Sequence, residues 1–179
     1  MQLVQYGNKI INRRNLFISQ LNEIVVKIHE SLTGEKEKIK IYYEPSSDCE
    51  YFEKNLLKNR ERDIKMKSTS VGPHRDDICF MSGNIDIRKF GSQGQQRTTA
   101  LAARLAEIDL IREETGENPV LLLDDVFSEL DESRQKFLLE SIGDLQAFVT
   151  CTGIEDSVKK YISKDNLFYV ENGVITPQK

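Results

Sequence analysis

The feature of this sequence that most constrains its fold is an uninterrupted apolar run, Val120-Leu121-Leu122-Leu123. A strand with one face in water alternates apolar and polar residues, whereas a strand covered on both faces is apolar throughout. The run therefore predicts a strand that is buried on both faces. Such strands belong to parallel sheets that carry helices on both faces, which indicates an α/β fold.

The rest of the chain fits this class, because helical and strand periodicities alternate along it. Apolar residues at helical spacing predict a helix through 17–32 that ends at Gly34, and alternation predicts a strand over 39–43. The other predicted elements are, in chain order, a charged helix over 49–67, a hairpin of 78–81 with 85–87, a helix with Ala100, Leu101, Leu105, Ile108 and Ile111 along one side, a helix over about 132–142, a strand over 146–150, a helix over 154–162 and a strand over 166–170. This order predicts a largely parallel, helix-covered sheet.

Composition and charge divide the chain into a helical segment, 1–67, and a second segment, 68–179. The first segment holds 13 Lys and Arg against 10 Asp and Glu, although the whole chain has a net charge of −4. A contact with DNA or with a protein partner is therefore expected on 1–67. Three scattered cysteines indicate a reducing cytoplasm, and no apolar run approaches the roughly 20 residues that span a membrane.

Two adjacent acids, Asp124 and Asp125, end the apolar strand. Ligands of open α/β sheets bind outside the carboxyl ends of the strands, so these carboxylates lie where chemistry is expected. One division of roles has Asp124 holding Mg²⁺ through water and Asp125 orienting or deprotonating an attacking water. The alternative is that the pair caps a helix or ends an exposed turn.

A second polar cluster, Gly91-Ser92-Gln93-Gly94-Gln95-Gln96-Arg97-Thr98, runs directly into an apolar-striped helix. A helix start needs one capping oxygen, and this one carries two glycines, a serine and three glutamines. Free backbone N–H groups and the positive end of a helix suit an anion, and Gly94 lets the backbone approach closely. The cluster is polar, rich in donors and open to close approach, which predicts a ligand at this helix start; the alternative is a flexible glycine loop before an ordinary helix.

Together, these motifs resemble those of ABC-type ATPases. The run VLLLDDVFSELD is similar to a Walker B motif followed by a D-loop, and Ser92-Gln93-Gly94-Gln95 is similar to the signature LSGGQ, with Gln93 in place of its first glycine. The resemblance implies that Asp124 is the metal carboxylate and Asp125 the catalytic carboxylate. It also implies that Asp131 of the D-loop crosses a dimer, and that four signature residues meet ATP held by the other subunit: Ser92, Gln93, Gly94 and Gln95.

One motif of such ATPases is missing, the Walker A loop GxxxxGK[ST], whose backbone cradles the phosphates. None of the ten glycines is followed by lysine, and none begins the pattern. The chain therefore carries the part of the site that meets ATP from across a dimer, together with the metal and water end. We expect it either to be the C-terminal part of a longer protein or to complete its site with another polypeptide.

The stretch SVGPHRDD at 70–77, together with FGSQGQQRT and LLLDDVFSELDESRQ, resembles the RecF family of bacterial DNA-repair ATPases over nearly all of the chain. The resemblance implies the C-terminal half of an ABC-type (P-loop NTPase) head domain with a mostly parallel sheet, preceded by a helical lobe segment. It implies a full-length protein that binds ATP, Mg²⁺ and double-stranded or gapped DNA, dimerises around ATP, and helps load recombinase at single-stranded gaps with RecO- and RecR-type partners. We expect weak ATPase activity of the full-length protein and none of this chain alone.

The sequence leaves open the role of His74 and Arg75, the residue near the γ-phosphate, and one alternative function. His74 and Arg75 either contact phosphate or DNA, or they form local ion pairs with Asp76 or Asp77. The stretch AFVTCTG offers Thr150, Cys151 and Thr152 where many ABC-type ATPases have a histidine near the γ-phosphate. The other function that the residues allow is a stand-alone module that binds DNA or a protein through 1–67 and never handles ATP.

Overall fold

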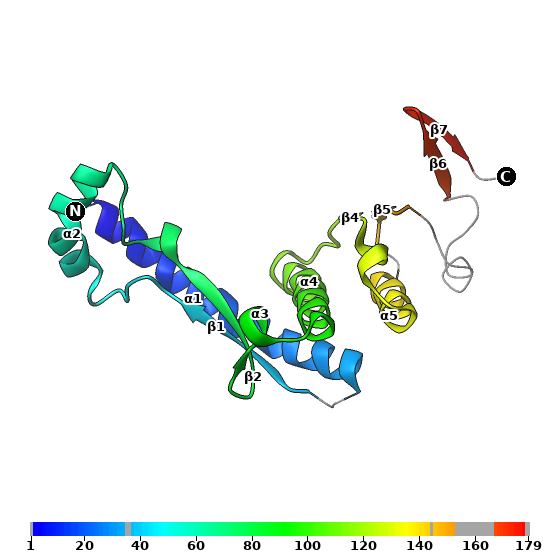
Figure 1. The fold of residues 1–179 in the computed structure, drawn as a ribbon, viewed down its shortest axis with the longest axis horizontal. Coiled ribbons are helices and arrows are strands. Elements are labelled where there is room, and N and C mark those ends of the chain that lie inside the picture. Colours follow the sequence, from blue (N-terminus) through cyan, green and yellow to red (C-terminus); the bar gives the residue numbers. More distant parts are fainter. Residues whose placement is uncertain (1, 35–36, 144, 153–166, 178–179) are drawn as a thin grey trace. The chain divides into compact units, whose positions relative to one another are not determined.

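The computed structural model describes residues 2–34, 37–143, 145–152 and 167–177 (Figure 1). The chain forms two compact units, Met1–Glu114 and Thr115–Lys179, and each is described by itself. The boundary expected between 67 and 68 falls inside the first unit, but the division by function into 1–67 and 68–179 stays a prediction. Within the described helices, none combines the length and the apolar character needed to cross a membrane.

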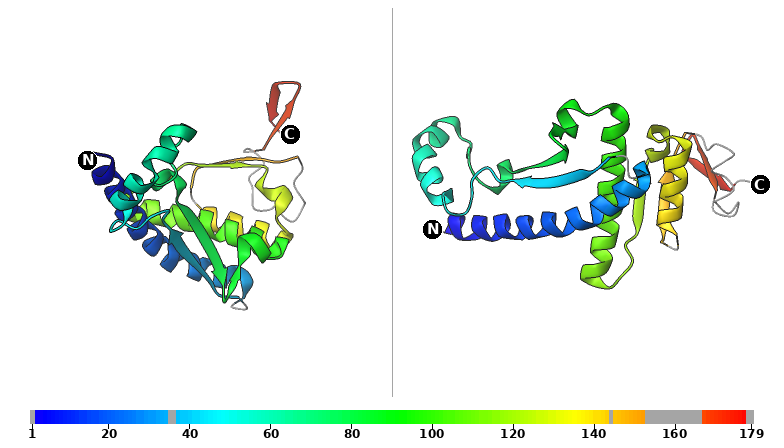
Figure 2. Two further views of the ribbon diagram at one scale, coloured as in Figure 1. Left: turned by 60° about the vertical axis from the view of Figure 1, so that its left-hand side comes forward. Right: turned by 90° about the horizontal axis from the view of Figure 1, so that it is seen from below.

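The first unit is built on a long helix and an antiparallel sheet. Helix α1 spans Gln2–Thr33, and the φ of 63° at Gly34 confirms the predicted stop. The sheet has the order β1-β2-β3, and α1 runs along β1 (Figure 2). Its strands are Ile39–Glu44 (β1), Asp77–Ser82 (β2) and Ile85–Asp86 (β3), with β1 and β2 in register from Ile39↔Ser82 to Glu44↔Asp77. The predicted hairpin of β2 and β3 is confirmed, except that Ile87 begins helix α3 (Ile87–Phe90).

The core of this unit lies where α1 and α4 (Gln93–Thr115) meet the sheet. Its buried members are Ile18, Leu21, Val25, Ile39, Ile41, Ile87, Ala102, Ala106 and Leu110. The stripe predicted for α4 is confirmed at Leu101, Leu105 and Ile108, which are buried. It is wrong at Ala100 and Ile111, which are exposed. The small side chains of Ala102 and Ala106 occupy the core face instead, since they let neighbouring elements approach α4 closely.

Helix α2 (Phe52–Met66) is attached to the start of α1 by one aromatic side chain. Phe52 is 1% exposed, and its ring lies against Gly7 of α1, where a Cβ would come within 2.2 Å of the ring. Most other side chains of α2 are exposed. A short 3-10 turn, η1 (Pro73–Arg75), then leads into β2. The charged surface of α2 is thus open to a partner.

The second unit carries the parallel pair that the sequence predicted. Strands β4 (Leu121–Asp124) and β5 (Ala147–Thr150) run parallel, in register from Leu121↔Ala147 to Asp124↔Thr150. Between them lie the 3-10 turn η2 (Val126–Glu129) and helix α5 (Glu132–Ile142), which confirms the helix predicted there. The α/β class and its parallel sheet are therefore confirmed, and antiparallel strands accompany them.

The prediction that β4 is buried on both faces is wrong for the described residues. Leu122 is 77% exposed, and Phe148, its partner in register, is 58% exposed. An apolar run shows that a strand can be covered on both faces, but burial also needs an element that covers it. Because side chains alternate along a strand, Leu122 and Asp124 share one face, so the acids follow directly on an open apolar surface.

The last described segment is an antiparallel hairpin of β6 (Phe168–Glu171) and β7 (Val174–Pro177). The sequence predicted β6 and missed β7. The signal was Asn172-Gly173 between apolar runs, the pair favoured in two-residue hairpin turns. Both residues have the positive φ that such turns require, 50° and 78°. The helix predicted over 154–162 lies outside the described residues.

Candidate functional site

The two acids at the end of β4 are joined to the end of β5 by one threonine. Parallel strands bring their carboxyl ends to the same sheet edge, and the register places Asp124 beside Thr150. The Thr150 hydroxyl donates to Asp124 Oδ1 at 2.5 Å and accepts the backbone N–H of Asp125 at 3.1 Å. All three residues are exposed, so the acids and the threonine form one cluster at an open edge.

The backbone of Asp125 has a conformation that is rare outside glycine. Its φ of 52° and ψ of 25° lie in the left-handed region, which costs an ordinary residue about 1–2 kcal/mol. Its N–H also donates to the carbonyl of Thr150 at 3.1 Å, and its own carbonyl accepts from Ser128 Oγ at 2.8 Å. These bonds stabilise the sharp turn between β4 and η2. They also fix the backbone from which the Asp125 side chain extends.

Asp124 suits the role of a carboxylate that holds Mg²⁺ through water. Mg²⁺ takes oxygen ligands, keeps several waters, and often uses only one or two carboxylates. Asp124 is exposed, with one carboxylate oxygen bound by Thr150. Across the described ranges, no three His, Cys, Asp or Glu side chains gather as a metal cluster, and a water-rich Mg²⁺ site does not need such a cluster. The metal role of Asp124 stays a prediction.

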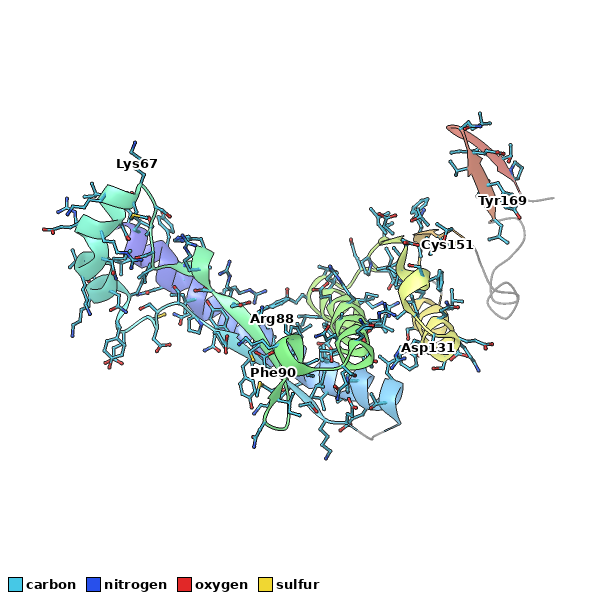
Figure 3. All side chains as sticks on the ribbon, in the orientation of Figure 1. Lys67, Arg88, Phe90, Asp131, Cys151 and Tyr169 are labelled. Carbon is cyan, nitrogen blue, oxygen red and sulfur yellow. The ribbon has the colours of Figure 1, made fainter. Side chains whose placement is uncertain are left out.

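The loop between η2 and α5, predicted to be a D-loop, is held at both ends. Asp131 caps α5 (Figure 3), accepting the N–H of Arg134 at 3.0 Å and the hydroxyl of Ser133 at 2.8 Å. The buried side-chain amide of Gln135 donates to the carbonyls of Phe127 and Leu130, at 2.9 and 3.0 Å. Gln135 was not among the predicted site residues, and its signal in the sequence is a polar residue on the core side of a helix. The dimer-crossing role of Asp131 stays a prediction.

The start of α4 is a reciprocal cap. The Ser92 hydroxyl accepts the N–H of Gln95 at 3.2 Å, and the side-chain carbonyl of Gln95 accepts the N–H of Ser92 at 2.9 Å. This Ser-x-x-Gln arrangement satisfies two backbone donors of the first turn. A hydroxyl keeps its proton when it accepts a bond, so Ser92 still has a donor to offer. The cap is therefore compatible with the phosphate contact predicted for Ser92.

The four predicted signature residues differ in how they are presented. Ser92, Gln93 and Gly94 are exposed. Gln95 is half-buried, and its side-chain amide donates to Glu37 Oε1 at 3.1 Å. Because both polar ends of the Gln95 side chain are already bonded, the surface at this helix start is made by the other three residues. Contact of all four with ATP stays a prediction.

The two glycines of this stretch are there for different reasons. A Cβ on Gly91 would come within 2.5 Å of the Ile87 carbonyl oxygen, so packing within the chain excludes any side chain. A Cβ on Gly94 would meet only Ser92 Oγ, at 3.9 Å, which is ordinary contact. Glycine in a helix costs roughly 0.5–1 kcal/mol relative to alanine. Among the described residues, no contact requires a glycine at position 94, so packing does not explain why the helix accepts this loss of stability.

The GPHRDD stretch is organised around one buried carboxylate. The side chain of Asp76 is 3% exposed and accepts from Arg14 Nη1 at 2.9 Å, from the Ser46 N–H at 2.9 Å and from the Tyr43 hydroxyl. Burial alone raises a carboxyl pKa, but these hydrogen bonds outweigh it, and the pKa of Asp76 is lowered. Burial and the bond to Asp76 raise the pKa of Tyr43 to about 12.

The alternative that His74 and Arg75 pair with the adjacent acids is wrong. Asp76 pairs with Arg14, while Asp77 pairs with Arg88 through two bonds of 2.9 and 2.7 Å. The fork from Arg88 lowers the pKa of Asp77 to about 2. His74 Nε2 lies 2.8 Å from the carbonyl oxygen of Thr69 instead. Arg75 donates to that carbonyl at 3.4 Å and to Ser68 Oγ at 3.1 Å. Both side chains are exposed, so their contact with phosphate or DNA stays a prediction.

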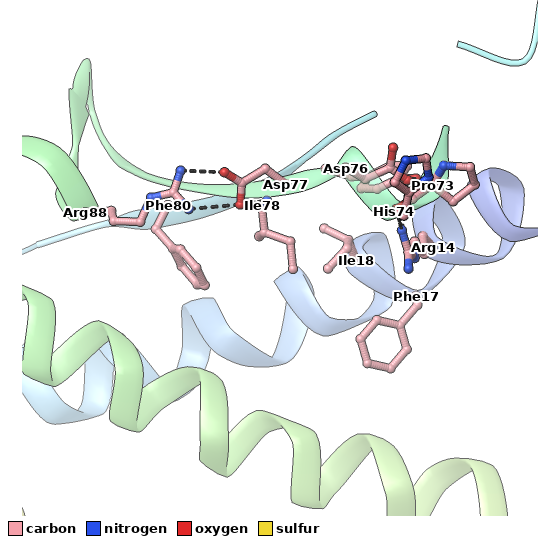
Figure 4. A pocket seen from close by; sticks show the side chains of 11 residues that line it. Arg14, Phe17, Ile18, Pro73, His74, Asp76, Asp77, Ile78, Phe80 and Arg88 are labelled. Atoms are coloured by element: carbon pink, nitrogen blue, oxygen red, sulfur yellow. Dashed lines mark hydrogen bonds and ion pairs between the residues drawn. The ribbon is translucent and has the colours of Figure 1, made fainter. Parts of the chain in front are cut away.

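A pocket of about 530 Å³ lies beside these charges. Figure 4 shows Phe17 and Ile18 of α1 lining it together with Phe80 of β2. Its two arginines, Arg14 and Arg88, are already paired with carboxylates. The pocket therefore presents apolar surface with a neutralised rim, which does not suit an anion.

Replacing Asp76 by asparagine should lower the free energy of unfolding of the chain by about 2 kcal/mol, because bonds to a charged acceptor are lost. The pKa of Asp76 is lower in the folded state, so its contribution is complete above the ordinary carboxyl pKa and is lost as pH falls through the lowered value. Urea unfolding at pH 7 and at acid pH measures both effects. Asp77→Asn is the matched control and should cost much less, because water screens that exposed pair. Equal losses from the two variants would show that Asp76 is not the centre of this stretch.

The chain has the fold of part of an ABC-type ATPase head. The features typical of this class are the parallel pair β4–β5 with two acids at its carboxyl end, and the long helix α4 that follows a capped polar start. No protein-family model matches the chain. Curated relatives of this chain are named "DNA replication and repair protein RecF", and two of them serve as examples. The protein from Agathobacter rectalis is 50% identical over 175 residues, covering 98% of this chain and 48% of the relative. That from Clostridium tetani is 48% identical over 182 residues, covering 96% and 49%.

Solved structures agree with these relatives. One, described as the recombination mediator protein RecF-ATPrS in the RecFOR pathway, has a TM-score of 0.79 at 37% identity and covers 97% of this chain and 47% of the other. A second, described as RecF-ATP, has a TM-score of 0.80 at 36% identity and covers 98% and 48%. The chain spans about half the length of the curated relatives it matches. The predicted resemblance is confirmed: over nearly all of its length the chain is similar to the C-terminal half of proteins named RecF.

Proposed function

We propose that this chain is the C-terminal half of a DNA-repair ATPase of the RecF kind. In this proposal the full-length protein binds ATP and Mg²⁺, dimerises around ATP, binds double-stranded or gapped DNA, and helps load recombinase at single-stranded gaps in the cytoplasm. The names of the relatives, which refer to DNA replication and repair, to ATP and to the RecFOR pathway, support it. They also support RecO- and RecR-type partners.

The observation that carries the proposal is the glycine at the start of α4. Gly94 is exposed in the first turn of a 23-residue helix, and no contact among the described residues forbids a side chain there. The cap satisfies the amide of Gln95, whereas the amides that come before it in a first helical turn have no carbonyl partner within the helix and favour an anion. A phosphate that approaches the backbone closely explains why a glycine stands at this position. Since Ser92 and Gln93 are exposed beside it, we assign this surface to the ATP of a second subunit.

The acid cluster supplies the other part of the chemistry. Asp125 orients or deprotonates the attacking water, and Asp124 holds Mg²⁺ through water. When bound, Mg²⁺ neutralises charge on the transferred phosphate. Asp131 reaches toward the second subunit from the N-terminus of α5. The chain has no phosphate-cradling GxxxxGK[ST] loop, so by itself it is inactive as an ATPase.

The DNA contact is assigned to a cationic stripe on α2. Lys54, Lys58 and Arg62 follow one another at intervals of four residues, and Lys65 comes three residues later, so all four share one helix face. All four are exposed. Arg75 lies beside the end of α2 through its bonds to Ser68 and Thr69, and His74 precedes it. An exposed stripe of cations without base-reading geometry suits the phosphate backbone.

This assignment predicts how salt affects DNA binding by the full-length protein. Each phosphate contact adds about one to the slope of log affinity against log salt concentration, so Lys58→Gln and Arg62→Gln should each make the slope shallower by about one. Fluorescence anisotropy on gapped DNA with Mg·ATP gives the slope at several salt concentrations. Lys27→Gln, an exposed lysine of α1, is the matched control and should leave the slope unchanged.

Two results would count against these assignments. Slopes that do not change in either α2 variant would remove the stripe from the DNA contact. Equally tight DNA binding by this chain alone, together with no effect of ATP on the full-length protein, would favour the stand-alone binding module.

A further inference from the structure

The hydroxyl of Thr150 is fully engaged by the two acids beside it. A hydroxyl has one proton to donate, and that of Thr150 goes to Asp124 Oδ1 at 2.5 Å. One of its lone pairs takes the N–H of Asp125 at 3.1 Å. A phosphate oxygen is an acceptor and needs a donor, so Thr150 could contact phosphate only by giving up Asp124. Of the three residues that stand where many ABC-type ATPases have a histidine near the γ-phosphate, Thr150 is therefore committed to the acids.

From this geometry we propose that Thr150 is a positioning residue that locks Asp124 and Asp125 into one rigid unit. The inference rests on the proposed function, because it concerns the residues assigned there to metal and water. It goes further in assigning the threonine to the acids and not to the nucleotide.

Rigidity is needed at this point because Asp125 sits in an unfavourable backbone conformation. Its φ is 52°, and its N–H is bonded by both the carbonyl and the hydroxyl of Thr150. The hydroxyl thus makes one of the three bonds that hold the left-handed turn at Asp125, and it also donates to the Asp124 carboxylate. Losing the hydroxyl removes one bond from each acid at once, although the pairing of β4 and β5 remains.

The test compares three variants of the full-length protein. Thr150→Val keeps the shape and removes the hydroxyl, Thr150→Ser keeps the hydroxyl, and Thr176→Val removes an exposed hydroxyl of β7 as the control. We expect Thr150→Val to lower kcat for ATP about tenfold with KM within twofold, because the hydroxyl positions catalytic groups and binds no substrate. Thr150→Ser should restore kcat to within about threefold, since it keeps both bonds. Thr176→Val should match the parental protein.

A second measurement does not depend on ATP. In the nucleotide-free protein, amide hydrogen exchange of peptides that contain Asp125 should be roughly three- to tenfold faster in Thr150→Val, because one hydrogen bond is lost. The exchange should be unchanged in Thr176→Val. This readout separates the two ideas: a parental protein that never hydrolyses ATP contradicts the proposed function, while unchanged exchange contradicts the positioning role.

Three kinetic outcomes would also overturn the proposal. A raised KM with parental kcat in Thr150→Val would make the threonine a nucleotide contact. Parental kcat and KM would leave it without a role. Failure of Thr150→Ser to restore activity would show that the hydroxyl is not the group that matters.

Discussion

Replacing Asp125 by asparagine in the full-length protein is expected to reduce ATP hydrolysis by about 10²- to 10⁴-fold while ATP binding and ATP-dependent dimerisation persist. The substitution keeps the shape of the side chain and removes the proton acceptor. Asparagine also suits the φ of 52°, because it populates the left-handed region more readily than most residues. The backbone bonds from Asp125 to Thr150 do not involve the carboxylate, so the turn should remain.

Phosphate release measures hydrolysis, calorimetric titration measures nucleotide affinity, and light scattering measures the dimer. Asp109→Asn is the matched control, because this acid of α4 forms a surface pair with Arg112 and should leave hydrolysis at the parental rate. Phosphate release measured with the isolated chain gives the background rate of hydrolysis. If Asp125→Asn hydrolysed ATP as fast as the parental protein, another group would have to be the catalytic carboxylate.

The parts of the fold that depend on neighbouring residues were predictable from the sequence. The stop of α1 at Gly34 follows from one glycine, and α5 follows from apolar spacing behind a capping aspartate. The cluster of Asp124 with Thr150 was partly predictable as well. Both residues end apolar strands, and parallel strands meet at one edge. Local sequence patterns therefore predicted both the helices and strands and the sheet edge where the acids lie.

Contacts between distant segments could not be predicted in this way. Arg14 and Asp76 are 62 residues apart in the sequence, so the adjacent His74 and Arg75 looked like equally good partners for the acid. The packing of α1 along the sheet decides the pairing, and no local signal encodes it. Burial failed for a related reason. Leu122 and Ile111 are apolar and correctly spaced, but exposure depends on what lies over them in space.

The second large effect is expected at the helix start. Ser92→Arg in the full-length protein should abolish ATP-induced dimerisation and spare ATP binding within each monomer. Ser92 is exposed at the N-terminus of α4, on the surface we assign to the ATP of the other subunit. An arginine there is too large for a closed interface, even though its charge attracts phosphate. Steric exclusion should win, because a packed interface cannot absorb the added volume without separating.

Ser92 also caps α4, so the experiment must separate bulk from the lost cap. Ser92→Ala removes the hydroxyl that accepts from Gln95, which costs about 1 kcal/mol, but adds no volume. It should weaken dimerisation moderately, whereas Ser92→Arg should abolish it. Light scattering with a slowly hydrolysed ATP analogue gives the mass, and titration gives the nucleotide affinity. Equal loss of dimer and affinity in Ser92→Arg would mean that the motif serves the ATP of its own subunit. If Ser92→Arg still formed the ATP-induced dimer, Gly91–Thr98 would be only a capped loop before a helix and not part of the dimer interface.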